Sequence, residues 1–553
     1  MKKTFFLLIF AFIGTVCSIS NAQTIHYVKP NGTGNGSSWA NAAGNIQDMI
    51  DASAAGDQVW VAAGTYIPTY NTGTEHYTKT FMLKDGVHLY GGFAGNETSI
   101  SARAKSDKDG NGKVEPWEFT NETILYGRFE GTTIVYLAQK LVSMGYPVAF
   151  VMETQFDGFS VTNGATGIAS YGKNIINNCI VKENRLSCGI YNDVDGIVSN
   201  CYITHNYNSI ELSTSGTINN KYTRQGGGIF NLGVVKNCVV SWNECEIKGG
   251  IYKNGTYAQG GGIYNDKGIV INCIFEWNRC YATTVGSYST HAEGGGIYNN
   301  GGVVRNCILS YGSCLSYQSN KYCYAYGGGI HNYGGTVSNC LVYKNHLSSY
   351  DGKELGNWEG GAGIYSGNNS NPGNIYCSTV INNTIYNSTS DNIYIAIGKM
   401  YNCIHEDDNL KQNFIDPFEG DFRLKPGSPY IEAGSLNNLP DWIINGTDLA
   451  GKPRVTNGKI SLGAYEFDPN IGIDELNLSI ISFVVFPNPA QTELFIKSDL
   501  EIEKVEIYSI MGTLLRVENN FKEKISVSDL PKGIYFLKVR TDEGVVNRKF
   551  VKE

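Results

Sequence analysis

Acidic and amide side chains early in the chain follow the spacing of a calcium-binding loop. Asp107, Asp109 and Asn111 occupy its first, third and fifth positions, Lys113 would contribute its backbone carbonyl, and Glu118 would close the loop. Ca²⁺ prefers these oxygen ligands. The sequence therefore predicts a calcium site, and calcium is the only cofactor that it suggests. The pattern occurs once and has no clear pair of flanking helices, so a polar surface loop is the alternative.

Tyrosines crowd the segments that separate one group of repeated residues from the next. Aromatic rings offer an apolar face to a sugar and a polar tip for hydrogen bonds. Because these segments occupy one place in the repeat, we expect them to project as loops from one flank, where repeat proteins often bind. The predicted ligand-binding residues are Tyr222, Tyr252, Tyr257, Tyr288, Tyr322, Tyr326 and Trp358. The alternative is that the rings stack on one another and seal the loops.

Catalytic residues are not identified by the sequence. A polysaccharide lyase needs a base and a cation that stabilises the resulting charge, which clustered Asp or Glu beside Lys or Arg would supply. No such cluster recurs in the repeats, and the remaining candidates stand alone: Asp195, His205, His291, His331 and Glu359. We therefore expect a non-catalytic protein that binds glycans or a host surface. A polysaccharide lyase or glycoside hydrolase acting on acidic polysaccharide is the alternative.

One motif repeats through the middle of the chain. Gly-Gly-Gly-Ile-aromatic-Asn occurs in full or weaker form around Ile190, Ile229, Ile263, Ile297, Ile330 and Ile364, at steps of 39, 34, 34, 33 and 34 residues. A second marker, usually Asn-Cys before apolar residues, follows each copy. Its shortest interval, Cys179 to Cys201, is 22 residues, enough for three short strands and tight turns. Such a coil buries its apolar face only by stacking, with strands about 4.8 Å apart.

The repeat predicts an all-β fold, a right-handed parallel β-helix with its markers in columns. Asn side chains would stack amide on amide and tolerate the positive φ of a corner, and the cysteines would form a column of small buried side chains. The expected structural ladder is Asn200, Cys201, Asn237, Cys238, Asn272, Cys273, Asn306, Cys307, Asn339 and Cys340. We expect mostly free thiols, although stacked cysteines lie near enough for some disulfides.

The ends of an open β-helix need caps. Residues 45–53 are the best helical stretch and precede the first expected strand, 58–66, so they predict an N-terminal capping helix. The opening His26-Tyr-Val-Lys-Pro-Asn-Gly and Ser37-Ser-Trp-Ala resembles the start of many bacterial pectate-lyase-like β-helix proteins.

The far end of the β-helix carries a second resemblance. Phe414-Ile-Asp-Pro-Phe-Glu-Gly-Asp-Phe, Ile431-Glu-Ala-Gly and Leu462-Gly-Ala-Tyr-Glu are similar to the closing run of the choice-of-anchor Q family of surface β-helix proteins. This resemblance implies a β-helix domain at 23–467, with a closing segment at 411–467, displayed on the cell surface. It implies no particular activity.

The first residues read as an export signal. Lys2 and Lys3 precede an apolar run at 5–16 that is too short to span a bilayer, and small residues end the segment, so 1–22 is a predicted signal peptide. No other segment reads as a transmembrane helix. The net charge of −8 argues against a nucleic-acid partner, which would require a basic face.

The composition changes near the C-terminus. Residues 468–482 read as a linker, and short strands split by turns at 483–553 indicate a small immunoglobulin-like β-sandwich. Val485-Phe-Pro-Asn-Pro-Ala, Val505-Glu-Ile-Tyr-Ser-Ile-Met-Gly and Leu530-Pro-Lys-Gly-Ile-Tyr-Phe closely resemble the type A C-terminal sorting domain of the type IX (Por) secretion system of Bacteroidota. The resemblance implies recognition by the type IX machinery, translocation and cleavage, and attachment to surface lipopolysaccharide. The expected location is extracellular, attached to the outer-membrane surface.

Overall fold

A computed structural model of the chain describes residues 23–469 and 483–553, apart from short segments. The segments outside the description are 72–78, 128–132, 138–152, 213–220, 250–254, 285–288, 319–321, 351–356, 368–369, 386–391, 397, 406, 408, 419, 487–489, 499–501, 510–513, 520, 522–523 and 542–543. The predicted signal peptide and most of the predicted linker therefore lie outside the described residues.

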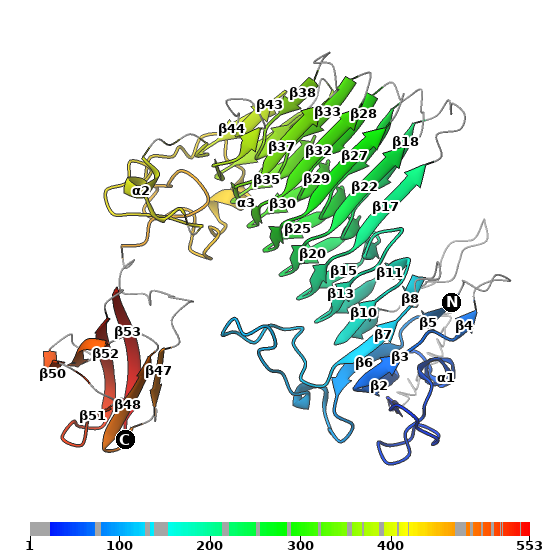
Figure 1. The fold of residues 1–553 in the computed structure, drawn as a ribbon, viewed down its shortest axis with the longest axis horizontal. Helices are drawn as coiled ribbons and strands as arrows, with labels where there is room; N and C mark the ends of the chain where they lie inside the picture. The colour runs from blue at the N-terminus through cyan, green and yellow to red at the C-terminus, as the bar shows by residue number, and fades with distance from the viewer. Residues whose placement is uncertain are drawn as a thin grey trace, which may run out of the picture.

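Three long sheets form the body of the protein, and their strands pair in parallel except at β4 and β5 (Figure 1). Sheet 1 contains β1 (Ile25–Val28), β2 (Gln58–Ala62), β6 (His88–Phe93), β9 (Thr154–Asp157), β12 (Asn174–Asn177), β15 (Ile197–Ser199), β20 (Val234–Lys236), β25 (Ile269–Ile271), β30 (Val303–Arg305), β35 (Thr336–Ser338), β40 (Gly373–Tyr376) and β44 (Gly398–Tyr401). Sheet 2 contains β3 (Gly64–Tyr66), β7 (Thr123–Tyr126), β10 (Phe159–Thr162), β13 (Ile180–Lys182), β16 (Tyr202–Thr204), β21 (Val239–Ser241), β26 (Ile274–Glu276), β31 (Ile308–Ser310), β36 (Leu341–Tyr343) and β41 (Thr379–Ile381). Sheet 3 contains β4 (Tyr70–Asn71), β5 (Lys79–Leu83), β8 (Thr133–Leu137), β11 (Thr166–Ser170), β14 (Ile190–Asn192), β19 (Ile229–Asn231), β24 (Ile263–Asp266), β29 (Ile297–Asn300), β34 (Ile330–Tyr333), β39 (Ile364–Ser366) and β43 (Ile393–Ile395).

The repeated residues lie over one another in successive coils. Ile229 pairs with Ile263, and Ile263 pairs with Ile297, each one coil further along the chain. The inward Ile, Val and Cys side chains of all three sheets form one buried core. Burying this continuous apolar column stabilises coils that could not fold singly. The fold class predicted from the sequence, a parallel β-helix followed by a small β domain, is confirmed.

The Asn-Cys markers occupy a corner between sheets 1 and 2. From Cys201 to Cys340, the residue after each marker cysteine donates its backbone N–H to the carbonyl of the cysteine one coil earlier, as Val239 does to Cys201 at 3.0 Å and Ile274 to Cys238 at 2.9 Å. The asparagine before each cysteine has a φ near +50°, and Asn272 Nδ2 lies 3.3 Å from Asn237 Oδ1. Asn accepts this left-handed corner at little cost. All thirteen cysteines outside the predicted signal peptide are free thiols, and twelve of them are buried.

Two shorter sheets extend one flank of the coils and are together called the lateral extension. Sheet 4 contains β17 (Tyr207–Leu212), β22 (Glu244–Gly249), β27 (Arg279–Thr284), β32 (Ser313–Gln318), β37 (His346–Tyr350) and β42 (Thr384–Ile385). Sheet 5 contains β18 (Tyr222–Gln225), β23 (Thr256–Gln259), β28 (Ser289–Glu293), β33 (Tyr322–Tyr326) and β38 (Asn357–Gly360).

The lateral extension is made of the residues that the sequence analysis expected as loops, so that expectation is wrong for most of their length. Small residues alternate along these strands, and Cys245, Cys280, Ala258 and Ala292 pack between the two sheets. Alternation of small inward and larger outward side chains lets two sheets lie close together, which explains why strands replace the expected loops.

Short elements close both ends of the β-helix. The helix α1 (Ile46–Ala52) begins at Asn45, whose side chain accepts from Gln47 N at 2.9 Å, and Ile46 and Ile50 are buried in the core. A 3-10 turn, η1 (Ile100–Ala102), follows β6. At the far end, α2 (Leu410–Asn413), β45 (Phe414–Asp416), β46 (Asp421–Leu424) and α3 (Asp441–Ile444) form the closing segment. Phe414, Phe422 and Leu424 pack against Leu341 and Ile381 of the last coils.

The C-terminal residues form two antiparallel sheets. One contains β47 (Phe483–Phe486), β48 (Glu493–Ser498) and β51 (Lys524–Ser526), and the other contains β49 (Ile502–Ser509), β50 (Leu514–Asn519), β52 (Gly533–Thr541) and β53 (Gly544–Lys552). Leu494 and Ile525 of the first sheet share a buried core with Val505, Leu537 and Phe550 of the second, so the domain is a small sandwich. Among the described residues no helix is long and apolar enough to cross a membrane.

Candidate functional site

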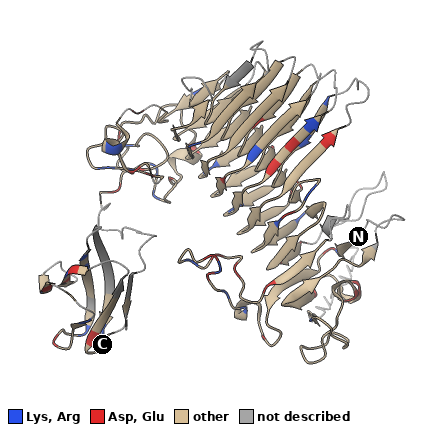
Figure 2. Ribbon diagram, viewed as in Figure 1, with Lys and Arg blue, Asp and Glu red and all other residues tan. Residues whose placement is uncertain are grey.

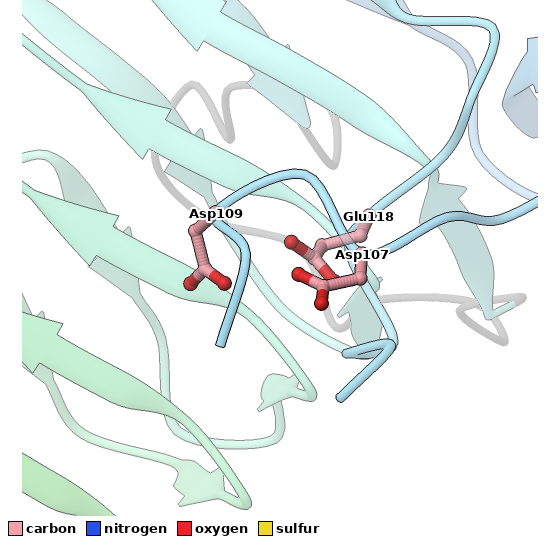
Figure 3. A group of neighbouring side chains, drawn as sticks. All are labelled: Asp107, Asp109 and Glu118. Carbon is pink, nitrogen blue, oxygen red and sulfur yellow. The ribbon is translucent and has the colours of Figure 1, made fainter. Parts of the chain in front are cut away.

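The predicted calcium loop leaves the β-helix after η1. Carboxylate oxygens of Asp107, Asp109 and Glu118 all lie within 4.8 Å of one another. Figure 3 shows Asp107 and Glu118 side by side, with Asp109 across the loop from them. Glu118 is buried, whereas Asp109 is exposed. Three converging carboxylates repel one another, and a divalent cation would relieve that repulsion.

Backbone N–H groups organise the loop around the carboxylates. Asp107 accepts from Gly110 N at 2.7 Å and from Gly112 N at 2.8 Å, while Glu118 accepts from Lys108 N at 3.0 Å. Burial raises the pKa of Glu118, but the backbone donors outweigh it and leave the pKa below its ordinary value. A carboxylate has about four acceptor sites, so these bonds leave oxygen lone pairs available to a cation.

The other two predicted ligands are placed differently. Asn111 directs its amide nitrogen at Asp109 Oδ2, 3.1 Å away, and its amide oxygen accepts from Lys113 N at 2.8 Å. Asn111 would have to turn its amide to present oxygen to a cation. The three carboxylates therefore fit Ca²⁺, whereas the arrangement at Asn111 and Lys113 is that of a loop held by its own hydrogen bonds.

A buried ion pair fixes the base of this loop. Arg103 Nη1 lies 2.7 Å from Asp157 Oδ1 of β9, and both side chains are nearly inaccessible to solvent. Further along the loop, the Trp117 ring stacks on Tyr202 of β16, with centroids 5.9 Å apart. The loop is thus held on the outer face of sheet 2, the face that the closing segment covers at the far end through Phe422 and Tyr343 (Figure 1).

The predicted tyrosines divide between two faces of sheet 5. Tyr222 lies in register with Thr256 and Thr290, which point inward, and it packs against the core of the lateral extension. It therefore does not join an outward face. Tyr252 and Tyr288 lie outside the described residues, as does the side chain of Trp358, whose backbone belongs to β38.

An outward column on sheet 5 carries aromatic rings in contact. Tyr257, His291 and Tyr324 occupy one register position in three successive coils, with centroids 4.0 and 4.4 Å apart and planes within 14°. Lys221 Nζ lies 3.6 Å from the Tyr257 ring centroid at one end of the column. Tyr322 beside the column is 52% exposed. We call these residues, together with Tyr326, the sheet 5 face.

A second column of rings runs along sheet 3 and meets the sheet 5 face. The ring centroids of Tyr326 and Tyr365 lie 4.4 Å apart. The Tyr365 ring stacks on the Tyr394 ring with centroids 5.2 Å apart. The column consists of Tyr191, Phe230, Tyr264, Tyr298, His331, Tyr365 and Tyr394. Apart from His331, which was also considered as a lone histidine, these residues served the sequence analysis only as repeat markers. Their position after the isoleucine in each Gly-Gly-Gly-Ile-aromatic-Asn copy was the signal that could have identified them.

Two histidines that stand alone in the sequence meet a buried carboxylate beneath these rings. Glu293 and His331 are 6% and 4% exposed, with His331 Nδ1 3.9 Å and His291 Nδ1 3.5 Å from the Glu293 carboxylate. Gln259 Nε2 donates to Glu293 at 2.7 Å. Burial lowers the pKa of His331 to about 4, although Glu293 opposes the shift. Because both groups are covered, no substrate reaches them in this conformation.

Charged side chains are sparse on the coils and gather on sheet 4 (Figure 2). Glu246 of β22 pairs with Lys248 at 2.7 Å, and Arg279 lies 3.9 Å from Glu244. Burial and the neighbouring Glu246 raise the pKa of Glu244. An open cavity of about 740 Å³ lies at the first strands of the lateral extension. It is lined by Arg185, Leu186, Tyr207, Ser209, Ile210, Glu211, Arg224 and Glu246.

The comparison with known protein families concerns the C-terminal domain and therefore export. Residues 484–553 match the family described as the secretion system C-terminal sorting domain. The crystal structure of pectate lyase Pel9A is similar at 14% sequence identity and a TM-score of 0.41, covering 81% of this chain and 97% of that chain. No curated protein matches the chain. The resemblance to the choice-of-anchor Q family stays a prediction. The sorting domain identifies the chain as cargo of the type IX secretion system, exported to the cell surface or the extracellular space.

Proposed function

We propose that this protein is a surface-displayed carbohydrate-binding protein, and that it binds through the sheet 5 face. The observation that carries the proposal is the outward column Tyr257–His291–Tyr324, whose rings stack at 4.0 and 4.4 Å and continue through Tyr326 to sheet 3. The rigid strands hold these rings in place before any ligand arrives. Pre-ordered aromatic side chains lose little conformational entropy on binding, which favours them at binding surfaces.

Several features favour a carbohydrate over a protein ligand. The rings of the column stack face to face, as the alternative in the sequence analysis expected, so the sheet 5 face presents ring edges together with phenol and imidazole groups that donate and accept hydrogen bonds. Its rings follow the stacked coils in a line, so a linear polymer could contact several coils at once. Export to the outside of the cell brings the face to the place where polysaccharides and host glycans occur.

A paired substitution tests the proposal. In the full chain, Tyr257→Ala/Tyr324→Ala removes two rings from the column and should weaken glycan binding at least tenfold on an array of plant, microbial and host glycans. The matched control is Tyr317→Ala/Tyr350→Ala, which removes another stacked pair, 5.7 Å apart, from sheet 4. Equal binding by the first variant and wild type would refute the proposal, as would equal losses in both variants.

Attachment to the cell surface is part of the proposal. We infer from the sorting domain that residues 483–553 engage the type IX machinery, are cleaved, and leave the β-helix linked to lipopolysaccharide. A chain truncated before residue 483 should accumulate in the periplasm. The full chain should appear at the surface as a ladder of species that anti-lipopolysaccharide antibody recognises. A single unmodified band at the surface would contradict the lipopolysaccharide linkage while leaving export intact.

The loop that carries Asp107, Asp109 and Glu118 is proposed to bind calcium. What supports this is the convergence of three carboxylates on a base fixed by Arg103 and Asp157. Bound Ca²⁺ would hold the loop, and with it Trp117, against sheet 2. In this proposal the ion has a structural role.

A polysaccharide lyase or glycoside hydrolase remains the second candidate function, and the cavity at the start of the lateral extension favours it. Glu211 and Glu246 line this cavity beside Arg185 and Arg224, which gives the carboxylates and cations that a lyase requires. Incubation with pectins and host glycosaminoglycans, with and without calcium, would reveal lyase activity as unsaturated uronate absorbance. Activity lost in Glu246→Gln would establish this alternative, and absence of both uronate absorbance and new reducing ends would exclude it for these substrates.

A further inference from the structure

A second set of exposed rings lies at the corner between sheets 2 and 4. Trp242 and Trp277 follow β21 and β26 directly, and Tyr311 follows β31. Their φ angles are 55°, 57° and 55°, the left-handed region that bulky residues rarely occupy. The chain thus places large aromatic side chains at positions where the backbone conformation favours Asn or Gly.

The neighbouring corner shows what this backbone conformation needs structurally. Between sheets 1 and 2 the equivalent positions are filled by Asn237, Asn272 and Asn306, with φ between 53° and 54°. Asn occupies this left-handed position in one coil after another. Folding alone therefore does not require tryptophan at a left-handed corner, and strained residues of this kind concentrate at functional sites.

At the aromatic corner the two tryptophans are open to solvent, Tyr311 is partly buried, and the three rings are aligned. Trp242 and Trp277 are 48% and 44% exposed. Their planes are within 7° of each other at 5.0 Å, and Trp277 and Tyr311 are within 3° at 4.2 Å. Exposed contiguous apolar surface of this kind marks interaction sites. We call Trp242, Trp277 and Tyr311 the corner strip.

The two ends of the corner strip are defined by other residues. His205 stacks on Trp242 at 6.0 Å and 11° at the first end. At the other end Lys344 Nζ donates to Tyr311 Oη at 3.1 Å and to Phe418 O at 2.8 Å. Lys344 thereby ties the strip to the closing segment, which holds the end of the strip in place.

Polar groups border the strip on both long sides. Glu276 is the last residue of β26 and immediately precedes Trp277. Glu244 is the first residue of β22 and follows Trp242 by two residues. The Arg279 guanidinium lies 3.9 Å from the Glu244 carboxylate. Glu246 lies two residues after Glu244 in β22. Carboxylate and guanidinium groups beside aromatic rings suit the hydroxyls of a sugar, which both donate and accept. Glu244 lies beside Arg279 and Glu246 pairs with Lys248, so the charges along the strip are largely balanced and offer little attraction to a polyanion.

We propose that the corner strip is a binding site for a neutral polysaccharide, separate from the sheet 5 face. Rings held at one position in three successive coils would contact successive sugars, with Glu276, Glu244 and Arg279 bonding their hydroxyls. The proposed ligand of the corner strip is uncharged, whereas the substrate of the alternative enzyme is an acidic polysaccharide. It does not depend on the sheet 5 face, because the two use different sheets.

The test uses substitutions that the backbone accepts. Trp242→Asn/Trp277→Asn introduces the residue that the neighbouring corner carries at the same φ, so the midpoint of thermal unfolding should stay equal or rise. The full chain is run in native gels cast with soluble mixed-linkage β-glucan, galactomannan or polygalacturonate. We expect at least one neutral polymer to retard wild type, the variant to lose at least tenfold in affinity for it, and polygalacturonate to retard neither through this site.

A fluorescence titration separates this site from the sheet 5 face. Tryptophan emission of wild type and of Tyr257→Ala/Tyr324→Ala should change on adding the neutral polymer, while the emission of Trp242→Asn/Trp277→Asn should not. Each of the following results would overturn the proposal: no retardation of wild type by either neutral polymer, unchanged affinity of the Asn variant, or a loss restricted to polygalacturonate. A change of oligomeric state in the Asn variant, measured by analytical ultracentrifugation, would assign the strip to self-association instead.

Discussion

Asn243 donates its side-chain N–H to Asn278 Oδ1 at 3.1 Å, although 35 residues separate the two in sequence. The amide oxygen of Asn243 accepts from Asn206 Nδ2 at 2.9 Å, one coil earlier. These asparagines are fully buried in a ladder that crosses the corner between sheets 2 and 4. The ladder joins consecutive coils with bonds that neither coil could make alone.

Asn243→Ala should lower the free energy of unfolding by roughly 2–3 kcal/mol, because partners in two coils lose buried hydrogen bonds. Asn272→Gly is the matched control, since Asn272 is an exposed corner residue with φ of 54°, which Gly also adopts. Denaturant unfolding followed by circular dichroism measures both. Equal effects of the two substitutions would mean that the buried ladder contributes no more than the exposed one.

The sequence predicted the parts of this architecture that depend on position in the repeat. Ile229, Ile263 and Ile297 stack because each coil must repeat the same inward residue, and a constant spacing reveals that need directly. The helix capped by Asn45 was predicted for a different reason, because residues 45–53 are a local helical stretch before the first strand. The strands of the lateral extension were missed because their inward residues are Cys and Ala, which carry a weak apolar pattern.

Acid should destabilise the protein through His331. The pKa of His331 is lowered by burial from its ordinary value of 6.5 to about 4 in the folded chain, with Glu293, Tyr298, Tyr326 and Tyr365 around it. The unfolded chain therefore binds more protons, so the stability contribution is complete above pH 6.5 and is lost as pH falls towards 4. The loss amounts to roughly 3 kcal/mol.

His331→Phe removes the titratable imidazole. It keeps an aromatic ring at a position that Phe230 fills in an earlier coil. Thermal unfolding between pH 7 and 4 should show a shallower decline in midpoint for the variant than for wild type. Parallel pH profiles for the two proteins would show that folding does not shift the pKa of His331 from its ordinary value.

Calcium should stabilise the wild-type chain and not Asp109→Ala. At one hundred times its dissociation constant, an ion that binds only the folded state adds about 2.7 kcal/mol. Asp195→Ala is the control, because it removes an exposed carboxylate from another turn. Calorimetric titration and thermal unfolding with and without calcium measure the effect. Wild-type affinity and thermal shift in Asp109→Ala would rule out a site at this loop.

The cysteines should behave as inert buried thiols. Without reductant, the native mature chain should react slowly with Ellman's reagent at all thirteen positions. Cys403 is partly accessible as a residue, but burial raises the pKa of its thiol to about 12, which keeps the thiolate scarce. In guanidinium chloride thirteen thiols per chain should react. A lower number under denaturing conditions would reveal disulfides between neighbouring coils.

The candidate binding residues were harder to predict than the fold. Tyr257 was identified because tyrosines were selected from the tyrosine-rich segments. His291 lies in one of these segments but is not a tyrosine, and Trp242 lies outside them, so neither was identified as a binding residue. What joins His291 to Tyr257 is register across 34 residues, and what exposes Trp242 is the left-handed corner. Both features depend on the exact strand boundaries, which spacing alone does not provide.

Hydroxyl-radical footprinting of the full chain, with and without a bound polysaccharide, tests the account most directly, because it locates the contact residue by residue. The account predicts protection of Tyr257, Tyr324 and Tyr326 by a ligand of the sheet 5 face, and of Trp242, Trp277 and Tyr311 by a neutral polysaccharide. Protection confined to the cavity around Tyr207 would instead point to the alternative enzyme. Oxidation unchanged at all six aromatic residues with ligand bound would contradict the account.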